Sequence, residues 1–269
     1  MTLASPKQQI KKPSIKILGA YGGKSTNMQL TSLQLSKEVV LDAGNILEGL
    51  GNGIRNINHV FISHAHLDHI NDIGFLIDST FENRTEPLKV YGRTKTLDAI
   101  EKNIFNWDIW PDFTKINLIG SDLKSVEFVP FELGDTIEVD GCIIKAIPNN
   151  HTPSSNGFVI EKENRAILFS SDTYCCDSIW EEINTNPKIK AVIIDVSFPS
   201  RMAQLAFDSK HLTPLLLKEE LKKLQRDDIT VHINHIKPTY KTEVVIEVIK
   251  EDLLLNGGLI LEAQDVVEF

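Results

Sequence analysis

The sequence predicts an α/β fold in which groups of strands alternate with helices. Short runs rich in Val, Ile and Leu fill the first sixty residues, and similar runs return between residues 126 and 169. Apolar residues at helical spacing follow the first group, as Ile70, Ile73 and Ile77 show. Strand-rich halves that are each followed by helices are typical of layered α/β proteins, although periodicity alone does not choose the architecture.

The individual strands are expected where β-branched and other apolar residues cluster between turn residues. In chain order they are Ser14–Leu18, Met28–Leu35, Val39–Leu41, His59–Ile62, Leu88–Tyr91, Val126–Phe131, Thr136–Val139, Ile143–Ile147, Phe158–Ile160, Ala166–Phe169, Ala191–Ile194, Ile229–Ile233 and Leu259–Leu261.

Helices are expected where start and stop signals bracket an apolar stripe. They are the stretch Ile70–Phe81, then Thr94–Phe105, Ser178–Ile183, a helix that begins at Thr213–Pro214, and one that Thr242 caps and Asn256 ends. Thr213 and Pro214 combine a capping residue with Pro at the first helical position. The two glycines after Asn256 stop the last helix.

The composition is that of an ordinary folded protein, with 42% hydrophobic and 24% charged residues in 269. Residues 1–13 carry three lysines and no apolar core, so we expect a flexible tail and no signal peptide. Residues 14–269 lack repeats and linkers and are expected to form a single domain. No apolar run approaches the ~20 residues that span a bilayer. Three cysteines, an odd number, suit a reducing compartment, so we expect a cytoplasmic protein.

The charge balance bears on the class of partner. The formal net charge is -9, and no block of Lys and Arg exceeds two residues. Proteins that bind long nucleic acids usually present a basic face to the phosphates. The acidic balance therefore argues against long nucleic acid as a partner. It leaves a small phosphate ester open, because bound metal cations supply positive charge locally.

The segment Phe61–His69 carries the strongest chemical signal. An apolar strand leads into a turn that holds His64, His66, Asp68 and His69, and an amphipathic helix follows. Alternation places the first two histidines on one side of the extended turn, whereas the other two residues point elsewhere. Neutral imidazole and carboxylate donors suit zinc, iron or manganese. Because four such donors lie within six residues, we interpret the segment as metal-binding.

This segment resembles the HxHxDH signature of the metallo-β-lactamase superfamily, and other motifs extend the resemblance over nearly the whole chain. The further matching motifs are Leu41-Asp42-Ala43-Gly44, Asn149-Asn150-His151-Thr152, Ser170-Ser171-Asp172-Thr173 and His232-Ile233-Asn234-His235. The resemblance implies a four-layer αββα sandwich with the site at one edge of its two sheets.

Motifs in the C-terminal half are similar to those of the class II cyclic-nucleotide phosphodiesterases. These motifs are Ile193–Pro199, Lys210–Pro214 and His235–Pro238. The resemblance implies a small-molecule substrate, cAMP or cGMP, that is hydrolysed to a 5′-nucleotide. Many members of this family are homodimers, so the resemblance also implies a possible homodimer.

The resemblance also implies a ligand set for two divalent metal ions. One metal would be held by His64, His66 and His151, and the other by Asp68, His69 and His235, with Asp172 bridging both. Zinc is the expected metal, and manganese or iron also suits these donors.

The implied chemistry uses a hydroxide held between the two metals, which attacks phosphorus in line with the leaving ribose 3′-oxygen. Asp68 would orient this hydroxide, and His211 would donate a proton to the leaving oxygen. Asp195 is the expected partner that fixes the tautomer of His211 and raises its pKa. Asp42 is expected to support the metal ligands by hydrogen bonding. His59 and His232 are expected to lie outside the site.

Three other functions remain open from the sequence. An RNA endonuclease of the tRNase Z type would share the ligand set and a counterpart of His211, but it normally uses a basic, Gly/Pro-rich arm that this chain lacks. A thioester or lactone hydrolase would not need His211 as an acid. A nucleotide-binding sensor could keep the metals without turnover.

Overall fold

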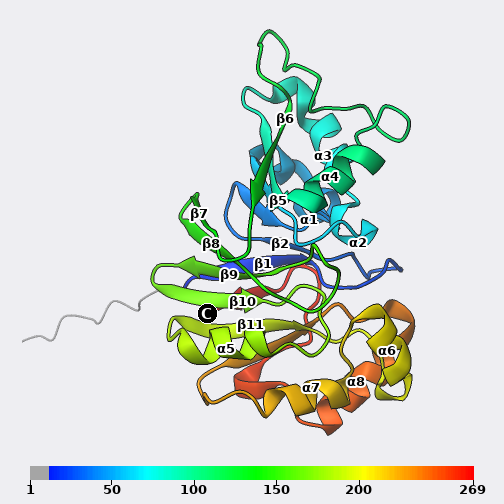
Figure 1. Cartoon of the computed structure of the whole chain (residues 1–269), viewed down its shortest axis with the longest axis vertical. Helices are drawn as coiled ribbons and strands as arrows, with labels where there is room; N and C mark the ends of the chain where they lie inside the picture. Colours follow the sequence, from blue (N-terminus) through cyan, green and yellow to red (C-terminus); the bar gives the residue numbers. More distant parts are fainter. Residues whose placement is uncertain (1–11) are drawn as a thin grey trace, which may run out of the picture.

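Two stacked β-sheets form the centre of the computed structural model, which describes residues 12–269 (Figure 1). The first sheet has seven strands in the order β13-β1-β2-β3-β4-β5-β6, and the second has six in the order β12-β11-β10-β9-β8-β7. The first consists of β1 (Ser14–Gly19), β2 (Ser32–Gln34), β3 (Val39–Leu41), β4 (His59–Phe61), β5 (Leu88–Arg93), β6 (Val126–Phe131) and β13 (Val266–Glu268). The second consists of β7 (Thr136–Val139), β8 (Cys142–Ile147), β9 (Gly157–Lys162), β10 (Arg165–Phe169), β11 (Ile189–Asp195) and β12 (Thr230–Asn234).

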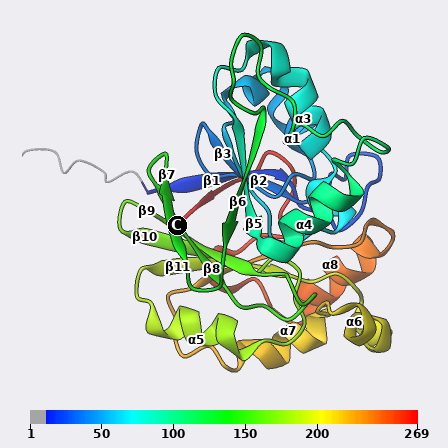
Figure 2. The same cartoon turned by 45° about the horizontal axis from the view of Figure 1, so that its top comes forward.

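Helices flank the two sheets on their outer sides (Figure 2). Those beside the first sheet are α1 (Ile46–Leu50), α2 (Leu67–Ile70), α3 (Ile73–Thr80) and α4 (Thr94–Asn103). Those beside the second are α5 (Asp177–Thr185), α6 (Ala203–Ser209), α7 (Pro214–Leu221) and α8 (Lys241–Lys250). The 3₁₀ turns are Gly51–Asn56, Phe81–Asn83, Ser200–Met202, Pro238–Tyr240 and Leu255–Gly257. The expected αββα order is confirmed.

Strand periodicity explains why the first sheet is covered on both faces. Successive side chains of a strand point to opposite sides. Val40 and Val60 accordingly join the core beneath the helices, whereas Leu41 and Phe61 join the core between the sheets. There Phe61 meets Phe158 of the second sheet edge-on, with ring centroids 6.3 Å apart. A sheet buried on both faces needs the nearly continuous apolar strands that the sequence shows.

The strand directions bring the functional loops to one edge. β3, β4 and β5 are parallel to one another, and so are β10, β11 and β12. The carboxyl ends of parallel strands meet at the same edge of a sheet, where ligands bind in open α/β sheets. Asp42, His64, Asp172, Asp195 and His235 lie at or just after such ends.

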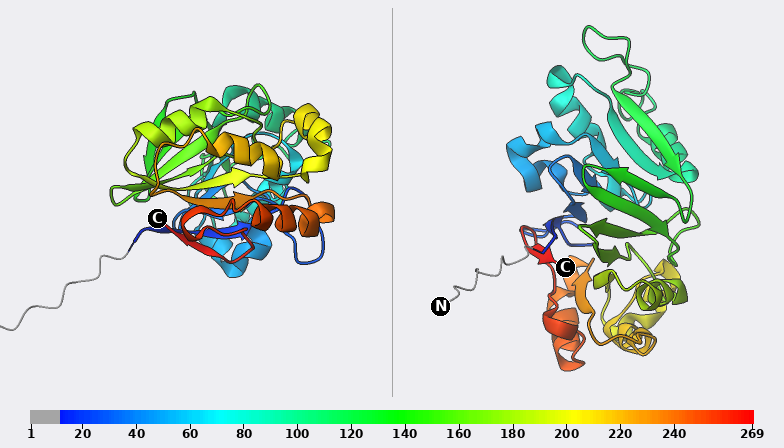
Figure 3. Two further views of the ribbon diagram at one scale, coloured as in Figure 1. Left: turned by 90° about the horizontal axis from the view of Figure 1, so that it is seen from below. Right: turned by 90° about the vertical axis from the view of Figure 1, so that its left-hand side faces the viewer.

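Two predicted strands differ from the structure. Leu259–Leu261 forms one isolated bridge, from Ile260 to Ile233, and no strand. The chain turns away after this bridge, and the last strand is β13, whose Val266 and Glu268 pair with β1. Figure 3 shows this C-terminal strand beside the N-terminal one. The predicted strand Met28–Leu35 shortens to β2 (Ser32–Gln34), because Met28 and Leu30 form only isolated bridges.

The helices agree with the prediction in part. Thr213 caps α7 by accepting a hydrogen bond from the Leu216 amide, and Pro214 occupies the first turn. α8 begins at Lys241, not after a Thr242 cap, because the 3₁₀ turn Pro238–Tyr240 runs directly into it. The short helices α1 and α6 were not predicted, since each spans only two turns or fewer and shows no long apolar stripe.

The predicted tail, residues 1–13, lies outside the described residues except for Lys12 and Pro13. The carbonyl of Pro13 accepts a hydrogen bond from the amide of Phe269 at 3.0 Å. The division into a tail and a single domain stays a prediction. Between residues 12 and 269, no helix is long and apolar enough to cross a membrane.

Candidate metal centre

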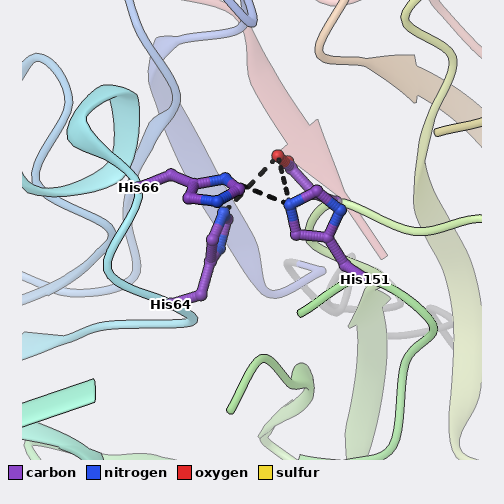
Figure 4. Close-up of side chains that lie close together, drawn as sticks. His64, His66 and His151 are labelled. Carbon is purple, nitrogen blue, oxygen red and sulfur yellow. Dashed lines mark hydrogen bonds and ion pairs between the residues drawn. The ribbon is translucent and has the colours of Figure 1, made fainter. Parts of the chain in front are cut away.

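The seven side chains that the sequence singled out as metal ligands converge at the shared edge of the sheets. They form two groups in which the donor atoms lie within 4.8 Å of one another, namely His64, His66, His151 and Asp172, and Asp68, His69 and His235. Figure 4 shows His64 and His66, from the loop between β4 and α2, pointing toward His151 from another loop. A third group of the same kind consists of Asp172, His211 and His235.

In the first group, two of the three rings are anchored through the nitrogen that faces away from the centre. Nδ1 of His151 donates to the carbonyl oxygen of Lys210 at 3.0 Å, and Nδ1 of His64 lies 3.1 Å from Oγ of Ser63. Nε2 of His64 is buried and has no hydrogen-bond partner. Nε2 of His151 lies 3.1 Å from Nδ1 of His66. The anchors thus leave Nε2 of His64 and of His151 directed at the centre, beside Nδ1 of His66.

The second group follows the same plan with carboxylate support. Nδ1 of His69 donates to Oδ2 of Asp42 at 2.7 Å, and Nδ1 of His235 lies 3.0 Å from Oγ of Ser197. The free Nε2 atoms of the two rings lie 3.3 Å apart. Oδ2 of Asp68 lies 3.3 Å from Nε2 of His235. Both rings therefore present Nε2 beside a carboxylate oxygen.

Asp172 lies between the two groups. Its Oδ1 is 3.2 Å from Nε2 of His69 and 3.1 Å from Nε2 of His235. Its Oδ2 is 3.6 Å from Nε2 of His64 and 3.7 Å from Nε2 of His151. One carboxylate oxygen thus faces each group, which is the geometry of a bridging ligand.

Burial and nearby charges shift the histidine pKa values in opposite directions in the two groups. Burial lowers the pKa of His64 well below its usual value and that of His151 to about 4, so both rings are neutral at pH 7. Burial also disfavours protonated His69, but the carboxylates of Asp172 and Asp42 outweigh it and raise the pKa of His69 well above its usual value. Neutral imidazole is the metal-binding form, and metal binding to His69 must displace its proton.

Asp42 supports both groups from beneath. It is fully buried, and its carboxylate accepts hydrogen bonds from the amide and the hydroxyl of Ser63 at 2.8 and 2.9 Å. Through that serine it acts on His64, and it contacts His69 directly. The residue has a φ of +59°, a left-handed conformation that Asp tolerates better than most residues. This geometry fits the supporting role expected of Asp42.

His211 and Asp195 form a buried pair beside the second group. Nδ1 of His211 donates to Oδ2 of Asp195 at 2.7 Å, and Oδ1 of Asp195 accepts from Oγ of Ser197 at 2.7 Å. Burial lowers the pKa of His211, but the charge and hydrogen bond of Asp195 reverse this and raise it overall. The His211 ring stacks 5.3 Å from that of His235. Its Nε2 is left to face the centre.

Several contributors were not predicted from the sequence. Ser63 and Ser197 anchor ligand rings, and the Lys210 carbonyl anchors another. Gly22 permits close packing, because a Cβ there would lie 2.5 Å from Cε1 of His235. A Cβ at Gly44 would lie 2.4 Å from the Asp68 carbonyl oxygen. All of these residues except Gly22 stand inside motifs that the sequence singled out, but the motifs gave no indication of their roles.

The two remaining histidines lie outside the centre, as expected. Nδ1 of His59 lies 3.1 Å from the hydroxyl of Tyr91. Nδ1 of His232 accepts a hydrogen bond from the Leu259 amide at 3.2 Å. His232 precedes His235 by three residues and ends on the opposite side of β12 because of strand alternation.

The donor set fits a pair of divalent metal ions. Nε2 of His64 and Oδ1 of Asp172 are buried without a hydrogen-bond partner, and buried polar atoms normally have one. A metal ion between the imidazoles and the carboxylate would satisfy these atoms. Clusters of His and Asp with this arrangement are typical of the dinuclear sites of metallo-β-lactamase folds.

Comparison with solved structures identifies the fold of this chain. The metallo-β-lactamase fold protein YhfI of Bacillus subtilis superposes with a TM-score of 0.74 at 16% identity, covering 95% of this chain and 99% of that one. The chain therefore has the metallo-β-lactamase fold, in which two mixed sheets are flanked by helices.

Sequence relatives narrow the family. A Yersinia pestis protein named "Probable 3′,5′-cyclic-nucleotide phosphodiesterase" is 27% identical, covering 83% of this chain and 78% of the relative. A ribonuclease Z of Methanosarcina acetivorans is 24% identical, covering 80% of this chain and 81% of the relative. The sequence pattern described as "cAMP phosphodiesterases class-II" matches residues 29–258. That match spans most of the chain, so this protein belongs to the class-II cAMP phosphodiesterase family.

Proposed function

We propose that this protein hydrolyses 3′,5′-cyclic nucleotides, cAMP or cGMP, to 5′-nucleotides with the help of two divalent metal ions. The observation that carries the proposal is the position of Asp172, which turns one carboxylate oxygen toward each of two histidine groups. Membership of the class-II cAMP phosphodiesterase family supports the choice of substrate.

The proposed ligands divide as the geometry groups them. One ion is assigned to His64, His66 and His151, the other to Asp68, His69 and His235, and Asp172 is the shared ligand. Two bound cations lower the pKa of a water molecule and offset the negative charge of a phosphodiester. We propose zinc for both ions, with manganese and iron as alternatives that the same donors accept.

The side chains around the ions have separate roles in the proposed reaction. His211 donates the proton that the departing 3′-oxygen requires, from the Nε2 that faces the centre. Asp195 holds Nδ1 of His211 at 2.7 Å, which keeps Nε2 directed inward and favours the protonated ring. The carboxylate of Asp68, which keeps 21% of its side-chain surface exposed, orients the attacking water.

The second candidate is an RNA endonuclease. The similarity to a ribonuclease Z over 80% of the chain favours it. Such an enzyme must hold a long polyanion, and this chain has a net charge of -9 with no Lys or Arg block longer than two residues. The charge therefore supports a small anionic substrate over tRNA. The homodimer and the cytoplasmic location stay predictions.

The test is turnover by purified protein of measured metal content. cAMP, cGMP, a linear dinucleotide and precursor tRNA are each supplied with and without chelator. We expect release of 5′-nucleotide from a cyclic substrate, loss of this activity with chelator, and intact tRNA. Asp172→Ala serves as the inactive control.

Each other outcome contradicts the proposal in a different way. Cleavage of tRNA with cyclic nucleotides untouched would establish the second candidate. A 3′-nucleotide as the sole product would refute the choice of bond. Turnover of a thioester or lactone alone would indicate a hydrolase of neutral substrates. Nucleotide binding without turnover, at full metal content, would indicate a sensor.

A further inference from the structure

Lys237 lies at the rim of the metal centre, two residues after His235. Its Nζ is 3.7 Å from Oδ2 of Asp68, and the two side chains keep 25% and 21% of their surface exposed. The backbone amide of Lys237 donates to the Ser197 carbonyl at 3.1 Å, and Pro238 follows it. The backbone is thus fixed on the same serine that anchors His235, whereas the ammonium group borders solvent.

The ammonium group and the proposed acid lie on either side of one ligand ring. Asp68, which pairs with Lys237, has Oδ2 3.3 Å from Nε2 of His235, and the His235 ring stacks 5.3 Å from that of His211. Lys237 therefore lies beside Asp68, and the His235 ring connects this position to His211. Asp68 and His211 are assigned to the attacking water and to the leaving oxygen, respectively.

A cation at this position needs an anionic partner. Among the described residues, Asp68 is the only carboxylate that forms an ion pair with Lys237. In the proposed function Asp68 binds a metal ion, so its charge is shared with that ion. Two divalent ions and an ammonium group repel one another unless an anion joins them. The substrate is the group that can supply this charge.

Other cations near the centre already have partners. Nζ of Lys210 lies over the ring of Phe207, 4.0 Å from its centroid. Arg93 donates to the carbonyl of Pro153 at 3.1 Å and lies 3.6 Å from a carboxylate oxygen of Glu132. Lys237 differs from them because its ion-pair partner, Asp68, is itself a member of the centre, which places the ammonium group at the centre's rim.

We infer that Nζ of Lys237 binds a non-bridging phosphoryl oxygen of the substrate, forming an anion subsite that selects phosphodiesters over neutral esters. The inference rests on the proposed function and specifies its substrate class. In an in-line displacement, the attacking and leaving oxygens lie on opposite sides of phosphorus, and the non-bridging oxygens lie between them. A cation beside Asp68, with His211 stacked on the adjacent His235 ring, is placed to meet these oxygens. A lysine acts there as a point charge.

The test compares Lys237→Met with Lys237→Arg and with a matched control, Lys250→Met. Lys250 is 76% exposed on α8, so its loss changes the net charge equally without touching the centre. Calorimetry measures the affinity of inorganic phosphate for each metal-loaded protein, and metal content is measured in parallel. Turnover of bis(4-nitrophenyl) phosphate, an anion, is compared with that of 4-nitrophenyl acetate, a neutral ester.

We expect Lys237→Met to weaken phosphate binding by about 10- to 100-fold, as the loss of a hydrogen bond to a charged group does. kcat/KM for the anionic diester should fall by a similar factor, with the neutral ester and the metal content unchanged. Lys237→Arg should retain most of the affinity, and Lys250→Met should match the wild type.

Unchanged phosphate affinity in Lys237→Met would overturn the inference. So would an equal loss in Lys250→Met, an equal loss for the neutral ester, or a loss of metal. Phosphate binding also separates this inference from the proposed function. If cyclic nucleotides are not hydrolysed but phosphate affinity still depends on Lys237, the subsite stands and the proposed function fails.

Discussion

The two donor groups of the centre differ in what holds their imidazoles. In the group His64, His66 and His151, no ring donates directly to a supporting carboxylate, because His64 reaches Asp42 only through the hydroxyl of Ser63 and His151 donates to a backbone carbonyl. In the group Asp68, His69 and His235, one ring has such a direct contact. His69 contacts Asp42 directly, and His235 reaches Asp195 through a serine.

The difference shows how one fold can build two unlike metal sites side by side. Burial alone lowers the pKa of His64 and His151, so their rings are already neutral and available. His69 is held protonated by Asp172 and Asp42 in the metal-free protein. We therefore expect the first group to keep a metal ion to lower pH than the second, because the second must release a proton on binding.

The largest effect is expected from Asp172→Ala, because this carboxylate belongs to both groups. Turnover should fall by at least about 10³-fold, since two-metal catalysis needs both ions in place. Metal analysis should show less than two ions per chain. Asp177→Ala, which changes an exposed side chain on α5, is the control and should behave as wild type. Two ions retained in Asp172→Ala would break the description of Asp172 as the shared ligand.

His211→Ala should give the next largest effect and leave both groups intact. Loss of a general acid costs about 10²- to 10⁴-fold in kcat. Because His211 also lies within ligand distance of Asp172 and His235, metal content decides its role. We expect two ions and a low kcat. A missing ion would instead make His211 a ligand of the second group.

Asp42→Asn should lower the metal affinity of one donor group and not of the other. It keeps the shape of the residue and tolerates the φ of +59°, but it removes the charge beside His69. Loss of such an outer partner costs about 10- to 100-fold in metal affinity. We expect this loss at one ion only, because Asp42 reaches His64 solely through Ser63. Stepwise metal titration at several alkaline pH values, where protons compete less with the metal, measures it. An equal loss of affinity for both ions would contradict this expectation.

The members of the two donor groups were predictable because each one stands at a recognisable point of the sequence. His64, His66, Asp68 and His69 are consecutive along one turn, and the other three follow apolar strands. Strand alternation also predicted the layered α/β fold and excluded His232 from the site. These signals are local, so a sequence shows them without knowledge of the folded structure.

The anchors were not predictable because they depend on how distant loops meet. Ser197 contacts His235 across 38 residues, and the Lys210 carbonyl contacts His151 across 59. A serine or a backbone carbonyl has no distinguishing pattern. The same reason explains the wrong strand at Leu259–Leu261, where the apolar run pairs with β12 at a single bridge. The turn that follows this run leads the chain away from β12, and the composition of the run does not show this.

The smallest and most specific effect is expected from Asp195→Asn, which acts on the second group's side of the centre without removing a ligand. Asp195 raises the pKa of His211, so protonated His211 persists to higher pH in the wild type. A general acid works only while protonated, and its contribution is lost as the pH rises through its pKa.

Removing the carboxylate charge lowers this pKa, so the alkaline limb of the kcat profile should move to lower pH. The acidic limb, which reports the activated water, should stay in place. Ser197→Ala removes one hydrogen bond from Asp195 and also the anchor of His235, so it should move the alkaline limb less than Asp195→Asn does and also weaken metal binding. An alkaline limb that stays fixed in Asp195→Asn would show that this limb reports another group, and His211 would lose its assignment as the acid.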